Sequence, residues 1–142
     1  MSYKILVAFD GSDGSVNAAN FGFNMAYYLP DVIIEVITVF TFTEEEAFFL
    51  GVNPEMFYKS EKEKAEKINS IFLKKTDTNN IPFSLSVLDG NPAKEIVKYA
   101  IEEGFNHIIM GSRGWGKIRK LLMGSVCKKV LENSHCSVTV VK

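Results

Sequence analysis

Tyr3-Lys4-Ile5-Leu6-Val7-Ala8-Phe9 opens the chain and runs directly into Asp10-Gly11-Ser12-Asp13-Gly14-Ser15. The first seven residues are almost continuously apolar, which is typical of a strand buried on both faces of a parallel sheet. The next six are turn formers, and either Ser12 or Ser15 is suited to cap a following helix. A buried strand that passes through a polar turn into a helix indicates an α/β domain.

The same alternation continues along the chain. Apolar runs predict four more strands at 32–40, 81–88, 107–110 and 138–141. Helical spacing and capping residues predict helices at 15–29, 54–75, 93–103 and 125–133. At 142 residues the chain is expected to form one domain, residues 1–142, with an open, five-stranded, parallel sheet and helices on both faces. In such sheets a ligand binds beyond the carboxyl ends of the strands, where the winding reverses.

An insert separates the second strand from the long helix. Thr43 and Glu46 have the spacing of a capping box, which predicts one or two helical turns that end at Gly51. The apolar run 48–50 is expected to cover the sheet edge, and the alternative is a lid over a ligand.

Composition and charge exclude several classes of protein. The net charge is −1, so a general polyanion or nucleic-acid binder is not expected. No signal-peptide pattern occurs, and no apolar run approaches the roughly 20 residues that span a bilayer. Cys127 and Cys136 lack metal or redox spacing, and a disulfide between them is the less favoured alternative. A reduced cytoplasmic protein without a membrane partner is therefore expected.

A second stretch carries the chemistry. It reads Gly111-Ser112-Arg113-Gly114, then nine residues, then Gly124-Ser125-Val126. No acidic residue occurs from 111 to 129, whereas six basic residues do. Glycines allow backbone N–H groups to approach a ligand, and a helix start presents free N–H groups to an anion. Arg113 and Lys117 are candidate phosphate cations, whereas Lys128 and Lys129 are interpreted as a solvated face.

Each of these positions has a structural alternative. Asp10 can accept hydrogen bonds from ribose hydroxyls, or it can bond its own turn. Gly111 and Gly114 can admit phosphates, or they can form an ordinary glycine loop. Ser125 can place a hydroxyl on phosphates and still begin a helix.

Two familiar nucleotide motifs are excluded. Gly111 to Lys117 matches the start of a Walker A loop, but Ile118 stands where a magnesium-binding hydroxyl is required. The dinucleotide pattern G-x-G-x-x-G is absent after the first strand, which argues against a nicotinamide enzyme. His107 and His135 lack metal-ligand spacing, and no catalytic residue can be named.

The chain resembles the universal stress protein family over essentially its full length. Three segments carry the resemblance. The 7–12 segment with Ser15 is similar to the family's opening, and the 111–126 stretch to the G-x-x-G-x9-G-[ST] signature of its ATP-binding branch. The 135–141 segment is similar to its terminal strand.

The resemblance implies a Rossmann-like sheet in the order 3-2-1-4-5, of the adenine nucleotide alpha hydrolase type. It places Ala8 and Asp10 near the nucleoside, and Val39 at adenine through its backbone. It assigns ribose and phosphates to Met110, Gly111, Gly114, Gly124, Ser125 and Val126. It also implies Mg²⁺ or Mn²⁺ between phosphates, and a homodimer through 138–141 that covers an exposed sheet edge.

The resemblance therefore predicts an ATP-binding regulator of the stress response, with an unidentified protein partner and at most slow hydrolysis. The alternatives are a dimeric interaction protein without a nucleotide, or a small nucleotide-dependent transferase. Two residues depart from the family pattern. Ser137 replaces a proline before the last strand, and the bulky Phe9 would spoil the nucleotide site if it pointed into the crevice.

Overall fold

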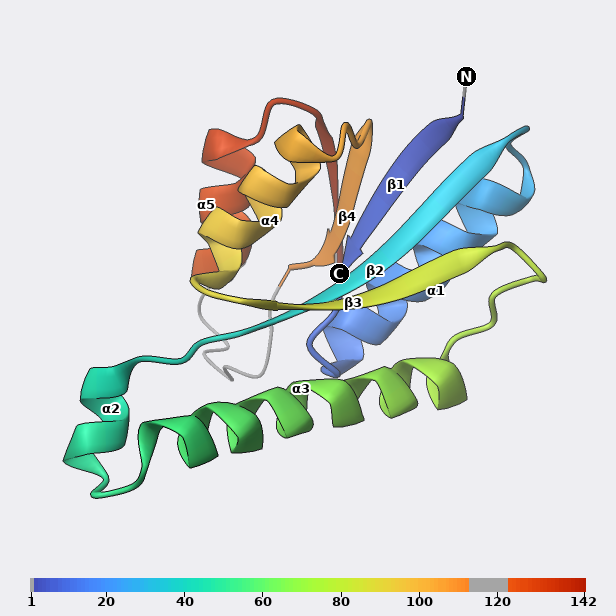
Figure 1. Ribbon diagram of the computed structural model, residues 1–142. Helices are drawn as coiled ribbons and strands as arrows, with labels where there is room; N and C mark the ends of the chain where they lie inside the picture. Colours follow the sequence, from blue (N-terminus) through green and yellow to red (C-terminus); the bar gives the residue numbers. More distant parts are fainter. Residues whose placement is uncertain (1, 113–122) are drawn as a thin grey trace.

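The computed structural model describes residues 2–112 and 123–142, in which strands and helices alternate as the sequence predicts (Figure 1). The strands are β1 (Tyr3–Ala8), β2 (Val32–Phe40), β3 (Phe83–Asp89), β4 (His107–Gly111) and β5 (Ser137–Val141). The helices are α1 (Asp13–Tyr27), α2 (Glu44–Phe49), α3 (Pro54–Lys75), α4 (Pro92–Glu102) and α5 (Ser125–Asn133). The predicted boundaries of β2, α3 and α5 match these, and the others differ by one or two residues.

The five strands form one parallel sheet in the order β3-β2-β1-β4-β5. The expected order is therefore confirmed, and β1 lies at the centre with β2 and β4 on either side. The Phe9 N–H extends the pairing beyond β1 by donating to the Ile37 carbonyl at 2.9 Å. The winding of the chain reverses between β1 and β4, which makes their carboxyl ends the expected place for a ligand.

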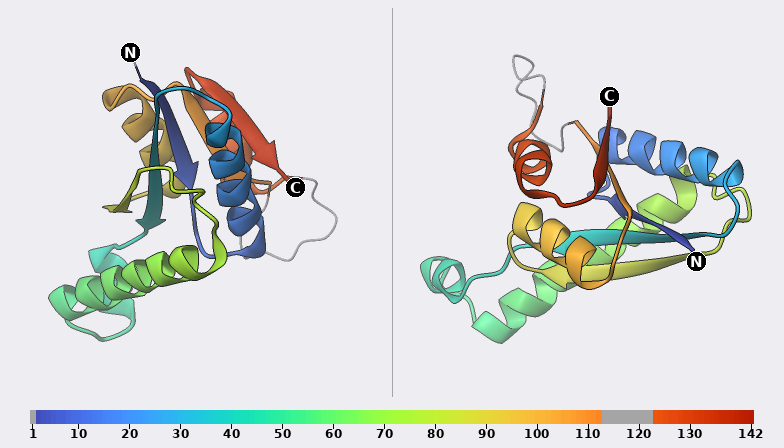
Figure 2. Two further views of the ribbon diagram at one scale, coloured as in Figure 1. Left: turned by 90° about the vertical axis from the view of Figure 1, so that its right-hand side faces the viewer. Right: turned by 90° about the horizontal axis from the view of Figure 1, so that it is seen from above.

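Two apolar cores lie on opposite faces of the sheet, and two helices cover each (Figure 2). Phe23 of α1 and Phe72 of α3 are fully buried on one face. Ile96 of α4 and Val130 of α5 are buried on the other. The strand side chains alternate between the two cores, so β1 and β4 are apolar on both faces, as a parallel sheet requires.

The helix starts follow the capping residues in the sequence. Ser12, Thr43, Asn53 and Asn91 each accept a hydrogen bond from a backbone N–H in the first turn. Proline occupies the first helical position of both α3 and α4, where its missing N–H costs nothing.

A half-buried polar cluster joins α4 to the sheet. Glu35 of β2 accepts hydrogen bonds from the Ser86 hydroxyl at 2.5 Å and from the Tyr99 hydroxyl at 2.6 Å. Burial raises the pKa of Tyr99 to about 12, and the bond to the Glu35 carboxylate adds to the effect. The phenol therefore stays protonated and keeps donating, which ties α4 to β2.

The insert differs from the expectation. Phe48, Phe49 and Leu50 do not cover the sheet edge, because their side chains are 84%, 88% and 61% exposed. The preceding residue, Ala47, is fully buried. One small residue therefore anchors α2, and the large apolar residues after it face solvent.

The longest described helix, α3, is rich in charged residues along its exposed side. Within residues 2–112 and 123–142, no helix combines the length and the apolar character that a membrane crossing needs.

Candidate functional site

Two loops meet at the carboxyl edge of the sheet, where β1 and β4 lie side by side. The loop after β1 begins at Asp10 and leads into α1. The loop after β4 begins at Ser112, and its far end, Gly124, leads into α5. Arg113 and Gly114, two of the predicted phosphate-binding residues, lie outside the described residues, as do Lys117 and the other basic residues up to 122.

A network of short-range hydrogen bonds shapes the loop after β1. Asp10 Oδ1 accepts from the Ser12 backbone N–H at 2.9 Å and also from the Ser12 hydroxyl. The Ser12 hydroxyl in turn accepts from the Ser15 N–H at 3.3 Å, so Ser12 rather than Ser15 caps α1. Gly11 has a φ of +84°, which favours glycine over other residues. Asp10 therefore bonds its own turn, and these bonds fix the carboxylate in place at the carboxyl edge of the sheet.

Gly111 brings the two loops together by direct backbone contact. A Cβ atom at Gly111 would lie 2.7 Å from the carbonyl carbon of Gly14, in the first turn of α1. The end of β4 therefore packs on the start of α1 with no room for a side chain. Sequence reasoning assigned Gly111 to a ligand and missed Gly14, although the spacing Gly11-x-x-Gly14 was a usable signal.

Backbone bonds join both ends of the loop after β4. The Ser112 N–H donates to the Val141 carbonyl at 2.9 Å, and the Gly124 N–H donates to the Ser112 carbonyl at 2.6 Å. These bonds place the start of α5 beside the end of β4. Sequence reasoning missed Ser112 in this role and had no signal for it, because the bonding atoms belong to its backbone.

The start of α5 has no side-chain cap. Gly124 occupies the capping position, and the first turn contains no acidic residue. The N–H groups of Ser125, Val126 and Cys127 cannot find partners within the helix, because a helix leaves its first N–H groups unpaired. These donors and the positive end of the helix dipole suit an anion. Burial raises the pKa of the Cys127 thiol, which therefore stays neutral in this turn.

Apolar side chains lie beneath these loops. Ala8 and Val39 are half-buried, Met110 is buried, and all three belong to the core on the α4 and α5 face. Phe9 points the other way: it is 2% exposed, and its ring packs edge-on against Phe72 at 5.5 Å. Phe9 therefore lies in the core under α1 and α3 and does not obstruct the sheet edge.

The histidines and cysteines take no part in this site. His107 lies at the amino end of β4 and bonds to the Tyr3 hydroxyl at 3.2 Å and to the Thr139 hydroxyl at 2.6 Å. Cys127 and Cys136 are both free thiols. Among the residues that the structure describes, no three His, Cys, Asp or Glu side chains come together as metal ligands would.

Comparison with known proteins gives a consistent result. The model of the family described as "Universal stress protein family" matches residues 1–142. Universal stress protein MJ0531 of Methanocaldococcus jannaschii is 32% identical over 98% of this chain and 81% of its own length.

Solved structures share the whole fold. MJ0577, from the same organism, has a TM-score of 0.81 and 28% identity, and the match covers 100% of this chain and 96% of that one. A universal stress protein in complex with cAMP has a TM-score of 0.68 and 21% identity, covering 99% and 97%. One from Archaeoglobus fulgidus in complex with dAMP has a TM-score of 0.61 and 22% identity, covering 100% and 98%.

Proposed function

The chain belongs to the universal stress protein family, and from this premise we propose that it binds ATP at the carboxyl edge of β1 and β4. We further propose that bound ATP makes it a regulator of a cellular stress response. One observation carries the proposal. An ordered carboxylate, Asp10, and a helix start without a side-chain cap, that of α5, both follow strands at the winding reversal of the sheet. Two neighbours in fold were solved with adenine nucleotides, which supports the same class of ligand.

The phosphates are proposed to lie on the start of α5. Gly124, Ser125 and Val126 would supply backbone N–H groups there, and the exposed Ser125 would add its hydroxyl. Arg113 and Gly114 are proposed to approach the phosphates from the loop after β4. The absence of acidic residues in the first turn of α5 supports placing the phosphates there, because a carboxylate would repel a phosphate.

The nucleoside is proposed to lie on the opposite side of the same edge. The Asp10 carboxylate, oriented by Ser12, would accept hydrogen bonds from the ribose hydroxyls. Ala8 and the backbone of Val39 would contact the base, while Met110 and Gly111 would lie under the ribose. Ala8 and Val39 belong to one apolar core, which suits them to a planar base better than to a charged group.

A divalent ion, Mg²⁺ or Mn²⁺, would bridge the phosphates and neutralise part of their charge. The described residues fit this arrangement only in part, since they form no cluster of three acidic, His or Cys side chains. The ion would therefore depend on phosphate oxygens for most of its ligands.

The proposed role is regulation and not dedicated catalysis. Hydrolysis needs a base or a positioned water, and no described side chain at this edge stands in that role, so turnover should be slow. We also propose that the protein is cytoplasmic and acts on a protein partner through a homodimer. The edge strand β5 would pair with its copy in the dimer, which covers backbone groups that an edge leaves open.

Calorimetric titration with ATP, AMP and cAMP tests the site, and Ser125→Asp is the decisive variant. A carboxylate at this position interacts favourably with the positive end of the helix dipole, so the free energy of unfolding should rise by about 0.3–1 kcal/mol. The same charge repels phosphate, so ATP affinity should fall by about tenfold or more. Stability and binding thus change in opposite directions, which a misfolded variant cannot imitate.

The matched control is Ser60→Asp, which makes the same change at an exposed position of α3. It should leave ATP affinity unaltered. If the wild type does not bind ATP at millimolar concentration, the proposed function is wrong. If Ser125→Asp binds as well as the wild type, the phosphates lie elsewhere.

A further inference from the structure

The short helix α2 and the residues after it expose more apolar surface than a solvated helix needs. Phe48 and Phe49 are 84% and 88% exposed, and Leu50 and Val52 follow at 61% and 43%. We call residues 44–52 the α2 hook. Figure 1 shows that the hook follows β2 in the chain and lies away from the sheet. Clustered, exposed aromatic side chains mark interaction sites.

Several contacts tie the hook to its own backbone and to the rest of the chain. Ala47 is fully buried, Thr43 caps the helix by accepting from the Glu46 N–H at 3.1 Å, and the Val52 N–H returns to the Ala47 carbonyl at 3.0 Å. The aromatic pairs Phe42–Tyr58 at 5.3 Å and Phe42–Phe57 at 5.8 Å brace its base. The exposed rings are therefore presented by an ordered element, which lowers the entropy lost on binding.

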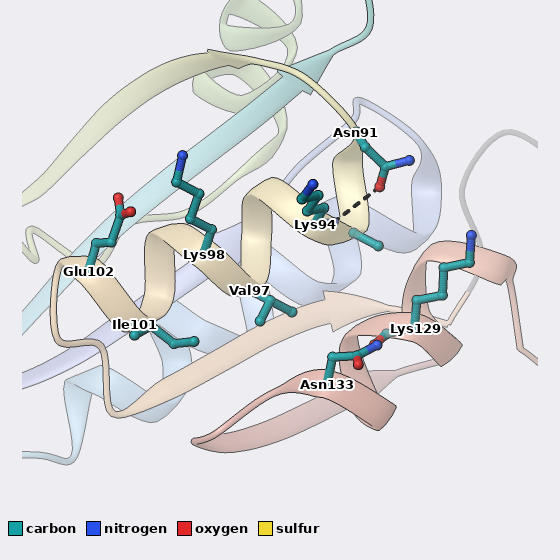
Figure 3. A pocket seen from close by; sticks show the side chains of 9 residues that line it. Asn91, Lys94, Val97, Lys98, Ile101, Glu102, Lys129 and Asn133 are labelled. Carbon is teal, nitrogen blue, oxygen red and sulfur yellow. Dashed lines mark hydrogen bonds between the residues drawn. The ribbon is translucent and has the colours of Figure 1, made fainter.

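A groove of about 530 Å³ lies between α4 and α5 on another part of the molecule (Figure 3). Val97 and Ile101 point from α4 into the groove, and Lys129 lines it from α5. Lys94 and Lys98 also line it from α4, with their side chains extending along its outer side and away from α5. The groove therefore has an apolar floor and a positively charged rim.

The hook and the groove have opposite charge. The hook contains Glu44, Glu45 and Glu46, all exposed, and no Lys or Arg occurs from 41 to 58. The groove has three lysines against one acidic residue, Glu102. In the described part of the chain, none of these lysines forms an ion pair. An anionic membrane would repel the hook, whereas a cationic, apolar surface is complementary to it.

We propose that the α2 hook of one copy seats in the α4/α5 groove of a second copy. The Phe rings cover Val97 and Ile101, and the glutamates approach Lys94, Lys98 and Lys129. The two surfaces differ, so the contact is head-to-tail and extends into chains or closes into a ring. It is separate from pairing through β5 and needs no nucleotide.

The contact is weak, because a hook of this size covers less than the roughly 1,200 Å² of a stable interface. Sedimentation velocity at protein concentrations up to about 1 mM should therefore show reversible growth in mass, reduced by added salt. Phe48→Ser/Phe49→Ser should weaken the association by about 30-fold or more, because it removes the apolar anchors. Lys94→Glu/Lys98→Glu should weaken it by about tenfold.

Mixing the two variants gives the sharpest test. The hook variant retains its groove and the groove variant retains its hook, so the mixture should form heavier species than either variant alone. Tyr28→Ser, at an aromatic ring that is 83% exposed outside both surfaces, and Lys62→Glu/Lys67→Glu on α3 are matched controls that should assemble like the wild type.

Three results would overturn the proposal. The first is that either double variant assembles as the wild type does. The second is that the mixture is no heavier than its components. The third is that the Phe variant loses ATP affinity while its assembly is unchanged, in which case the hook is a lid over the nucleotide.

Discussion

Two helices of this chain begin at the same edge of the sheet, and they begin in opposite ways. At the start of α1, Ser12 caps the first turn, Asp10 orients Ser12, and the acidic Asp13 opens the helix. At the start of α5, a glycine without a side chain stands at the capping position, no acidic residue occurs in the first turn, and Lys128 and Lys129 follow.

The proposed nucleotide site depends on this difference between the two helix starts. The chain itself satisfies the α1 start, where negative charge already balances the helix dipole, so a phosphate gains little there. The α5 start has no side-chain cap and no acidic residue in its first turn, so its N–H groups and its dipole suit an anion. The α1 side is thus suited to accept hydroxyl donors, and the α5 side to donate to an anion.

The largest expected effect comes from separating the end of β4 from the start of α1. In Gly111→Ala the new Cβ would meet the Gly14 backbone at 2.7 Å, and neither backbone segment can move without distorting β4 or α1. The free energy of unfolding, measured by urea denaturation, should fall by about 3 kcal/mol, the upper end of the range for overpacking. ATP affinity should fall with it.

Gly51→Ala is the control for backbone strain alone. Gly51 has a φ of +66°, but a Cβ atom added there would meet nothing within 4 Å, so alanine should cost only about 1 kcal/mol. Equal losses in the two variants would show that the Gly111–Gly14 contact is not what holds the loops together.

The alternation of apolar strands and capped helices was readable from the sequence because each element carries a local signal. Asn53 and Asn91 before prolines, for example, marked the starts of α3 and α4. The strand order was not readable from such signals. It followed from the resemblance to a family, because pairing between β1 and β4 joins residues about one hundred positions apart.

In the candidate site, too, local features could be predicted from the sequence and long-range contacts could not. Asp10 and Ser12 were readable as a turn, since their hydrogen bonds span two residues. The Gly14–Gly111 contact and the Ser112–Gly124 bond were not, because they depend on how distant backbone segments pack. The exposure of Phe48 and Phe49 was predicted wrongly, because an apolar run indicates burial and carries no information about what lies nearby.

An effect of intermediate size should come from removing the side-chain cap of α1. Ser12 is 4% exposed, and its hydroxyl both donates to Asp10 and accepts from the Ser15 N–H. Ser12→Ala removes both bonds and should lower the free energy of unfolding by about 1–2 kcal/mol. ATP affinity should fall only a few-fold, because the Asp10 carboxylate keeps its bond to the Ser12 backbone.

Ser15→Ala is the matched variant, since Ser15 is equally buried but its hydroxyl makes one bond, to the Ser12 carbonyl at 2.9 Å. It should cost less than Ser12→Ala, about 1 kcal/mol. A larger cost for Ser15→Ala would mean that the Asp10–Ser12 pair does not close the α1 start.

The smallest expected effect comes from giving α5 the kind of start that α1 has. Gly124 has a φ of −73° and a ψ of 164°, a conformation that serine adopts without strain, so Gly124→Ser adds a capping hydroxyl and leaves the backbone in place. The hydroxyl would accept from a first-turn N–H, and the free energy of unfolding should rise by a few tenths of a kcal/mol, roughly the difference between serine and glycine caps. The same N–H would then be less available to a phosphate, so the ATP dissociation constant from calorimetry should rise about twofold, as the same few tenths of a kcal/mol imply. A gain in stability with tighter ATP binding would show that the first-turn N–H groups of α5 are not the phosphate donors.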